Sequence, residues 1–387
     1  METLPLASIL ERCPTWRDAP VFSAKCFTSL MLIVFYICSM HNDNFLFSFQ
    51  NSTPISLYDS HQRLIHPRLY EDFINPNESL HLKKNGIVFP HKNNADFGVI
   101  ISHDVDHIYG HDKILHPQYR GGLRNISQLL LHDLRSKFSS SPKSQRIRKN
   151  EISISRFIEW ELKNNIPASY YFLSLHEGEQ DFNYRLEEIT DIIAGIQQAQ
   201  GEIALHGGHQ STVDFDTLVK EKKRLESASK LTITGFRSHY LKWAANKTEG
   251  FLSKANFQYD TSWGSAQQPG FVKGFCTPHP VWDPIEKSFA PWIEVPLIAM
   301  DCSFFDYMKL NENSAWELFI HLVEVVKKCN GILTILWHNS YYKQLPFYWK
   351  MLEYLQHQNC HFDTTQEFVN QANRSGYIDE LKKFYGQ

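Results

Sequence analysis

The sequence predicts an α/β fold in which strands and helices alternate along residues 95–387, after a smaller N-terminal domain in residues 1–94. Two observations carry this prediction. Short apolar runs recur from residue 97 onward, and amphipathic segments separate them. A run that is apolar throughout is typical of a strand buried on both faces. Repeated strand–helix units imply a parallel sheet or barrel.

The first 94 residues lack this alternation. Apolar runs at the start are followed by a polar stretch, residues 41–78, without a sustained helical period. We expect a small mixed or β-rich domain of unknown role. The apolar run at residues 26–40 is shorter than the roughly 20 residues of a spanning helix, and the features of a signal peptide are absent around it. We therefore expect a buried element and no stable membrane span, with membrane association through this run as the second interpretation.

Charge and cysteine content narrow the class of protein further. The formal net charge of -3 gives no reason to expect a nucleic-acid partner. The seven cysteines are scattered and form no CxxC pair, which argues against a disulfide framework and a cysteine-ligated zinc site. A cytoplasmic protein fits best. The sequence does not predict the oligomeric state.

The elements follow one another in a regular order. Strands are predicted at residues 97–102, 168–175, 202–205, 233–236, 257–259, 292–297 and 332–337. Helices are predicted at residues 125–138, 156–165, 184–200, 215–229, 247–255, 315–328 and 346–356. Functional residues of such folds gather at the carboxyl ends of the strands.

Polar clusters stand at five of these strand ends. Asp104 and Asp106 follow the first strand, and two carboxylates so close together favour a cation or an arginine nearby. A glycine-rich cluster with His206 and His209 follows the third strand, and His338 follows the last. Imidazoles in such places suit metal binding or acid–base work. Taken singly, each cluster is better explained by helix caps, surface loops or structural ion pairs. Their shared placement indicates one site.

The order of these clusters resembles the NodB-homology polysaccharide deacetylases, over residues 96–370. The resemblance implies a distorted (β/α) barrel with a divalent metal held by one Asp and two His. SHDVD at residues 102–106 resembles the first motif, which makes Asp104 the catalytic base and Asp106 a metal ligand. LHGGHQS at residues 205–211 resembles the second motif, with His206 as the next ligand.

The second motif departs from the family pattern at the third ligand. Its second histidine is expected four residues after His206, where this chain has Gln210. Three interpretations stay open: His209 reaches the metal, Gln210 ligates through its carbonyl oxygen, or the site has lost its metal. We favour His209. Zinc is the metal expected first, although the same ligand types accept Co, Ni, Mn or Fe.

The remaining motifs supply further roles by resemblance. In GFRSHY, Arg237 orients the base and the Tyr240 backbone N–H contributes to the oxyanion hole, while His239 replaces the usual proline. In YDTSW, Asp260 is expected near His338 and Trp263 near the substrate. His338 is the expected general acid. A loop containing Phe275 is expected to shape the substrate groove.

The expected function is metal-dependent removal of an acetyl group from an N-acetylated sugar or polysaccharide. This makes the chain a hydrolase of carbon–nitrogen bonds other than peptide bonds. Two alternatives stay open. In the first, the chain is a carbohydrate-binding protein of the same fold without activity. In the second, it is a C–N hydrolase that acts on a small non-sugar amide.

Overall fold

The computed structural model describes residues 74–108, 151–174 and 184–386. The predicted helix at residues 125–138 and the apolar run at residues 26–40 lie outside these ranges. So does most of the predicted N-terminal domain, which therefore stays a prediction. No helix in the described ranges is both long and apolar enough to cross a membrane.

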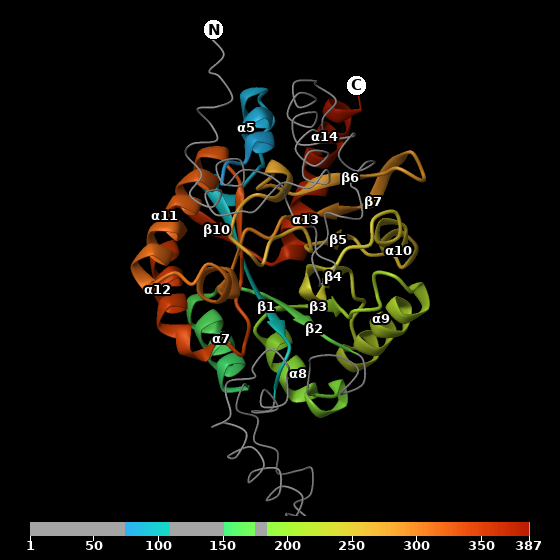
Figure 1. Ribbon diagram of the computed structural model, residues 1–387, viewed down its shortest axis with the longest axis vertical. Coiled ribbons are helices and arrows are strands. Elements are labelled where there is room, and N and C mark those ends of the chain that lie inside the picture. The colour runs from blue at the N-terminus through green and yellow to red at the C-terminus, as the bar shows by residue number, and fades with distance from the viewer. Residues whose placement is uncertain (1–73, 109–150, 175–183, 387) are drawn as a thin grey trace, which may run out of the picture. The chain divides into compact units, whose positions relative to one another are not determined.

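One sheet of ten strands organises the described residues (Figure 1). Its order is β6-β7-β5-β4-β3-β2-β1-β9-β8, and β10 pairs with the start of β1. Every pairing is parallel except that of β6 with β7. The strands are β1 Phe97–Val105, β2 Ser169–Phe172, β3 Glu202–Gly207, β4 Gly235–Ser238, β5 Tyr259–Asp260, β6 His279–Asp283, β7 Ser288–Glu294, β8 Ala299–Met300, β9 Ile332–Leu336 and β10 Cys360–Phe362. The predicted α/β fold with a mostly parallel sheet is confirmed. In the described residues no pairing joins β6 to β8, so the barrel is incomplete.

Helices follow most of the strands and cover the sheet. Figure 1 shows α7, α11 and α12 on one side of β1, with α9 and α10 on the other. The helices are α5 Asn77–Lys84, α7 Glu151–Asn164, α8 Thr190–Gln198, α9 Phe215–Ser229, α10 Thr248–Lys254, α11 Glu312–Cys329, α12 Leu345–Gln356, α13 Thr365–Arg374 and α14 Tyr377–Tyr385. Asp214 and Asn311 begin α9 and α11 by accepting a backbone N–H with their side chains, as helix caps do.

The central strand β1 shows why the sequence places polar groups inside the sheet. All nine of its residues are buried. Alternate side chains of a strand point to opposite faces. Val99, Ile101 and Val105 join the large hydrophobic core beneath the helices. Ser102 and Asp104 point the other way and contact Arg237 of β4. Apolar packing on one face therefore fixes polar groups on the other.

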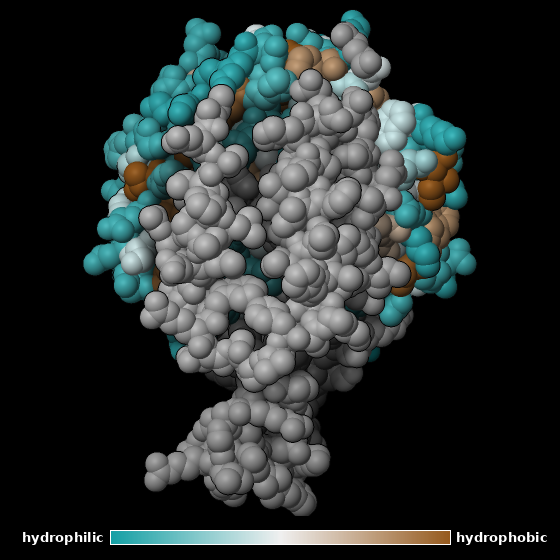
Figure 2. Space-filling view, turned by 45° about the horizontal axis from the view of Figure 1, so that its top comes forward, coloured by the Kyte–Doolittle hydropathy of each residue, from teal (hydrophilic) through white to brown (hydrophobic). Residues whose placement is uncertain are grey.

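The segment before β1 is packed onto the sheet assembly. Ser79 of α5 accepts a hydrogen bond from the backbone N–H of Cys276, at 2.9 Å. His91 Nε2 lies 3.1 Å from the carbonyl oxygen of Asn330. On the face seen in Figure 2, the described surface is mostly hydrophilic, with hydrophobic residues scattered among polar ones. Isolated apolar residues of this kind are normal on a folded domain.

Candidate metal centre and active site

The candidate site is built where β1, β3, β4 and β9 end. His206 of β3 and Arg237 of β4 are directly opposite one another in the parallel register. Asp104 belongs to β1, which extends three residues beyond the predicted end of this strand. His338 follows β9. Because these strands are parallel, their carboxyl ends and these side chains all lie at one edge of the sheet, as the sequence predicted.

Asp104 and Arg237 form a buried ion pair at the base of the site. Arg237 Nη1 donates to Asp104 Oδ1 at 2.7 Å, and the two side chains are 0% and 3% exposed. Arg237 Nη2 also donates to Ser102 Oγ at 3.1 Å. Its guanidinium lies 4.0 Å from the ring centre of Tyr171, a cation–π contact. Burial alone raises the pKa of Asp104, but Arg237 and the nearby histidines outweigh it, so the pKa is lowered from 3.8. Asp104 is thus held ionised.

Three further side chains converge above this pair. Single ligand atoms of Asp106, His206 and His239 all lie within 4.8 Å of one another. His206 Nε2 is 3.7 Å and His239 Nε2 is 4.0 Å from Asp106 Oδ1. These separations are too long for hydrogen bonds. Asp106 Oδ1 is buried and makes no hydrogen bond to the described part of the chain.

This donor set fits a divalent metal ion. One carboxylate and two imidazoles are the ligand types of zinc and related ions. Two donors bound at about 2.1 Å to one tetrahedral ion lie about 3.4 Å apart, so the observed spacings require only small shifts. His206 Nδ1 donates to the backbone carbonyl of Arg237 at 3.0 Å. This hydrogen bond turns Nε2 toward the carboxylates, 3.6 Å from Asp104 Oδ2 and 3.7 Å from Asp106 Oδ1, the orientation in which it could bind a metal ion.

His338 lies near the other carboxylate oxygen of Asp106 and is held by Asp301. His338 Nδ1 donates to Asp301 Oδ1 at 2.7 Å, and its backbone N–H donates to Asp301 Oδ2 at 2.6 Å. His338 Nε2 lies 3.9 Å from Asp106 Oδ2. Burial lowers the pKa of His338, but the carboxylates of Asp301, Asp106 and Asp104 outweigh it and raise the pKa to about 10. The imidazole is therefore held in its proton-donating form.

Tyr240 has an unusual backbone conformation beside these groups. Its φ is 59° and that of Leu241 is 53°, both in the left-handed region that side chains other than glycine rarely adopt. Backbone strain of this kind collects at functional sites. The residue expected to supply an oxyanion N–H is therefore at a specialised position, next to His239.

Other expected site residues lie differently. Asp260 Oδ1 accepts from Ser262 Oγ at 2.6 Å, while the partner of His338 is Asp301. Trp263 is 8% exposed and lies beneath the Lys273 ammonium, 2.9 Å from its ring centre. Phe275 is fully buried and stacks on His279 with ring centres 4.0 Å apart, so its ring faces protein instead of a groove.

His209 and Gln210 lie outside the cluster of three ligand atoms. The His209 ring stacks on His239 at 4.9 Å and on Tyr240 at 5.2 Å. Gln210 is exposed, and its backbone carbonyl accepts the N–H groups of Val213 and Asp214. Sequence reasoning missed two residues of this site, Asp301 and His239 as a metal-facing group. Asp301 directly follows β8, the same strand-end placement that marked the others.

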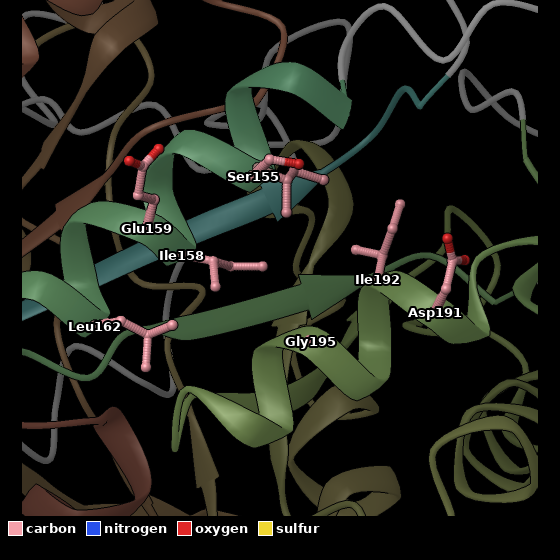
Figure 3. Close-up of a pocket in the computed structure, with 8 residues that line it drawn as sticks. Ser155, Ile158, Glu159, Leu162, Asp191, Ile192 and Gly195 are labelled. Carbon is pink, nitrogen blue, oxygen red and sulfur yellow. The ribbon is translucent and has the colours of Figure 1, made fainter.

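A separate groove of about 380 Å³ lies between α7 and α8 (Figure 3). Ile158, Leu162 and Ile192 supply its apolar wall, and Glu159 and Asp191 stand at its rim. None of its lining residues belongs to the site at the strand ends.

Comparison with known proteins establishes the fold. No family model and no curated protein matches the sequence. Among solved structures, the chain is similar to a protein from Mycobacterium smegmatis described as a polysaccharide deacetylase, with a TM-score of 0.51 and 15% identity over 74% of this chain and 94% of the other. A protein from Pseudomonas aeruginosa PAO1, described in the same way, has a TM-score of 0.51 and 13% identity over 73% of this chain and 93% of the other. Puue allantoinase has a TM-score of 0.51 and 13% identity over 74% of this chain and 94% of the other. The resemblance to the polysaccharide deacetylases is thus confirmed for the fold.

Proposed function

We propose that this chain is a metal-dependent hydrolase that removes an acetyl group from an N-acetylated sugar or polysaccharide. One observation carries the proposal. An ionised carboxylate, Asp104, and a histidine held in its protonated form, His338, both face a cluster of metal-type ligands. Hydrolysis of an amide needs a base for the attacking water and an acid for the leaving amine, and these two groups have the required protonation states.

The metal would be held by Asp106, His206 and a third ligand. When bound, such an ion lowers the pKa of water and polarises the acyl oxygen. Asp104 accepts the proton of the attacking water, and Arg237 keeps this carboxylate ionised and oriented through the 2.7 Å ion pair. The backbone N–H of Tyr240 stabilises the developing oxyanion. His338 donates its Nε2 proton to the departing amine, which completes the cleavage to acetate and a free amino sugar.

The likeness to the two deacetylases supports the substrate class, because acetylated carbohydrates are what such enzymes act on. The abundance of aromatic residues, with 9 Trp, 17 Tyr and 27 Phe, suits stacking on sugar rings.

The proposal is tested by acetate release from N-acetylglucosamine oligomers after supplementation with Zn, Co, Ni, Mn or Fe. We expect turnover with at least one ion, and losses of about 10²–10⁴-fold in Asp104→Asn and His338→Ala. Because each substitution leaves a buried charge, Arg237 or Asp301, without its partner, we expect both variants to be less stable than the wild type. Their turnover is therefore compared in buffer without denaturant, where circular dichroism shows both to be folded. Equal turnover in wild type and both variants contradicts the assigned roles. Sugar binding without turnover favours a binding protein.

A second candidate is a C–N hydrolase for a small non-sugar amide. The observation in its favour is the likeness to an allantoinase, whose TM-score of 0.51 equals that of the two deacetylases. Hydrolysis of allantoin, without acetate release from sugar oligomers under the same conditions, selects this candidate.

A further inference from the structure

The third metal ligand is the part of the site where the sequence motif and the geometry differ. The motif around His206 has a glutamine at the position of its second histidine, and His209 lies one residue earlier. The cluster of ligand atoms contains neither of them. It contains His239, the first residue of the turn His239–Leu241 that follows β4.

Strand geometry explains how His239 reaches the cluster. His206 and Arg237 are directly opposite in adjacent parallel strands, about 4.8 Å apart. His239 follows β4 directly, two residues after Arg237, and its Nε2 lies 4.0 Å from Asp106 Oδ1, so it stays on the face of the sheet that carries Arg237. It stands one step farther toward the edge of the sheet, beside His206. The rings of His206 and His239 are 4.9 Å apart and inclined at 68°.

This edge-on arrangement aims both imidazoles at one carboxylate oxygen. His206 Nε2 and His239 Nε2 lie 3.7 and 4.0 Å from Asp106 Oδ1. His239 is 5% exposed, and its other ring nitrogen, Nδ1, is buried without a hydrogen-bond partner in the described ranges. A buried ring nitrogen without a hydrogen bond is costly. An ion bound at Nε2 removes part of this cost.

We propose that His239 is the third protein ligand of the metal ion, together with Asp106 and His206. His209 stacks on the outer face of His239 and positions its ring without touching the ion, and Gln210 takes no part. This inference rests on the proposed function only for the presence of an ion. The chain thus replaces a histidine from the loop after β3 with one from the turn after β4.

The inference is tested by metal affinity, which does not depend on finding the substrate. Zinc binding is measured by competition with a chromophoric chelator in wild type, His239→Ala, His209→Ala and Gln210→Ala. Because loss of a group that merely supports a ligand costs about 10–100-fold in affinity, loss of His239 itself should cost at least about 100-fold. Gln210→Ala should match wild type, and His209→Ala, which removes a group that supports a ligand, should lose about 10–100-fold and less than His239→Ala.

Cobalt provides a second readout on the same proteins. The visible absorption of bound Co²⁺ reports its ligands, so it should change in His239→Ala and stay the same in Gln210→Ala. If His239→Ala does not fold, as judged by urea unfolding in chelator, His239→Gln replaces it with a side chain of similar reach. That variant should also bind zinc at least about 10-fold more weakly.

The outcomes separate the inference from the proposed function. Wild-type affinity in His239→Ala or His239→Gln, or a larger loss in His209→Ala than in His239→Ala, overturns the inference. Absence of any bound ion in supplemented wild type also overturns it. Zinc bound through His239 in a protein that releases no acetate leaves the inference standing and rejects the deacetylase.

Discussion

Breaking the Asp104–Arg237 ion pair should reduce the stability of the fold, by an amount that follows from the burial of the pair. Arg237→Met removes the guanidinium that donates a hydrogen bond to the Asp104 carboxylate, at a site where both side chains are almost fully buried. Removing one partner of a buried ion pair costs about 3–5 kcal/mol, because the other charge is left uncompensated. We expect a loss of this size at pH 8, measured by urea unfolding in excess chelator.

The pH dependence of this loss has a definite sign. In the wild type the pKa of Asp104 is below 3.8, so the pair stabilises the fold above that pH and the stabilisation is lost as the pH falls. In Arg237→Met burial raises the pKa of the same group. The variant then loses stability as the pH rises from about 4 toward the raised pKa, by about 1.4 kcal/mol for each pH unit in that interval. The deficit relative to wild type should therefore be smaller at pH 5 than at pH 8.

A second substitution isolates the contribution of Asp104. Burial raises the pKa values of Glu202 and Asp260, and the charge of Arg237 partly offsets this effect, so the single variant perturbs three carboxyl groups. Adding Asp104→Asn to Arg237→Met removes the uncompensated charge and should restore about 1–3 kcal/mol at pH 8. Further destabilisation by the second substitution, or an equal deficit at both pH values, refutes this account of the pair.

Three further predictions concern the acid, the packing and the metal. Asp301→Asn lowers the pKa of His338 from about 10, because it removes the carboxylate charge that stabilises the protonated imidazole; acetate release should fall about 10²-fold, with its alkaline limb moved to lower pH. An unchanged alkaline limb argues against His338 as the acid. Gly207→Ala should cost about 1–3 kcal/mol in urea unfolding, since the added carbon meets the Phe236 ring. Gly250→Ala in α10 meets nothing within 4 Å and should instead gain about 0.5–1 kcal/mol. Chelation should lower the stability of protein held at 100 times its metal Kd by about 2.7 kcal/mol, and equal urea midpoints with and without chelator contradict a bound ion.

Much of the fold was predictable because its central strands are buried on both faces. The runs that form the buried parts of β1, β3 and β9 are mostly apolar, and each leads directly to a polar cluster. The charged amphipathic helix α9 was predicted at residues 215–229 and is found at Phe215–Ser229. Local patterns of this kind are set by burial, which the sequence displays directly.

Other elements depend on partners that are distant in the sequence. The antiparallel strand β6 and the short strand β10 form only because β7 and β1 offer them an edge. β8 has two residues, too few to show any hydrophobic periodicity. The strand was therefore not predicted, and Asp301 at its end was not recognised. His239 was noted only as a replacement for a proline. Its position two residues after Arg237, directly beyond the end of β4, is a sign that it could lie on the same face, which motif spacing alone does not carry.

The central claim is that separate strand ends assemble one metal site for hydrolysis. An anomalous-difference map at the absorption edge of the supplemented metal tests this claim most directly. We expect one peak within about 2.0–2.2 Å of a ligand atom of Asp106, His206 and His239, with Asp104 and His338 facing it. A peak at other residues, or none in crystals grown with excess metal, contradicts the account.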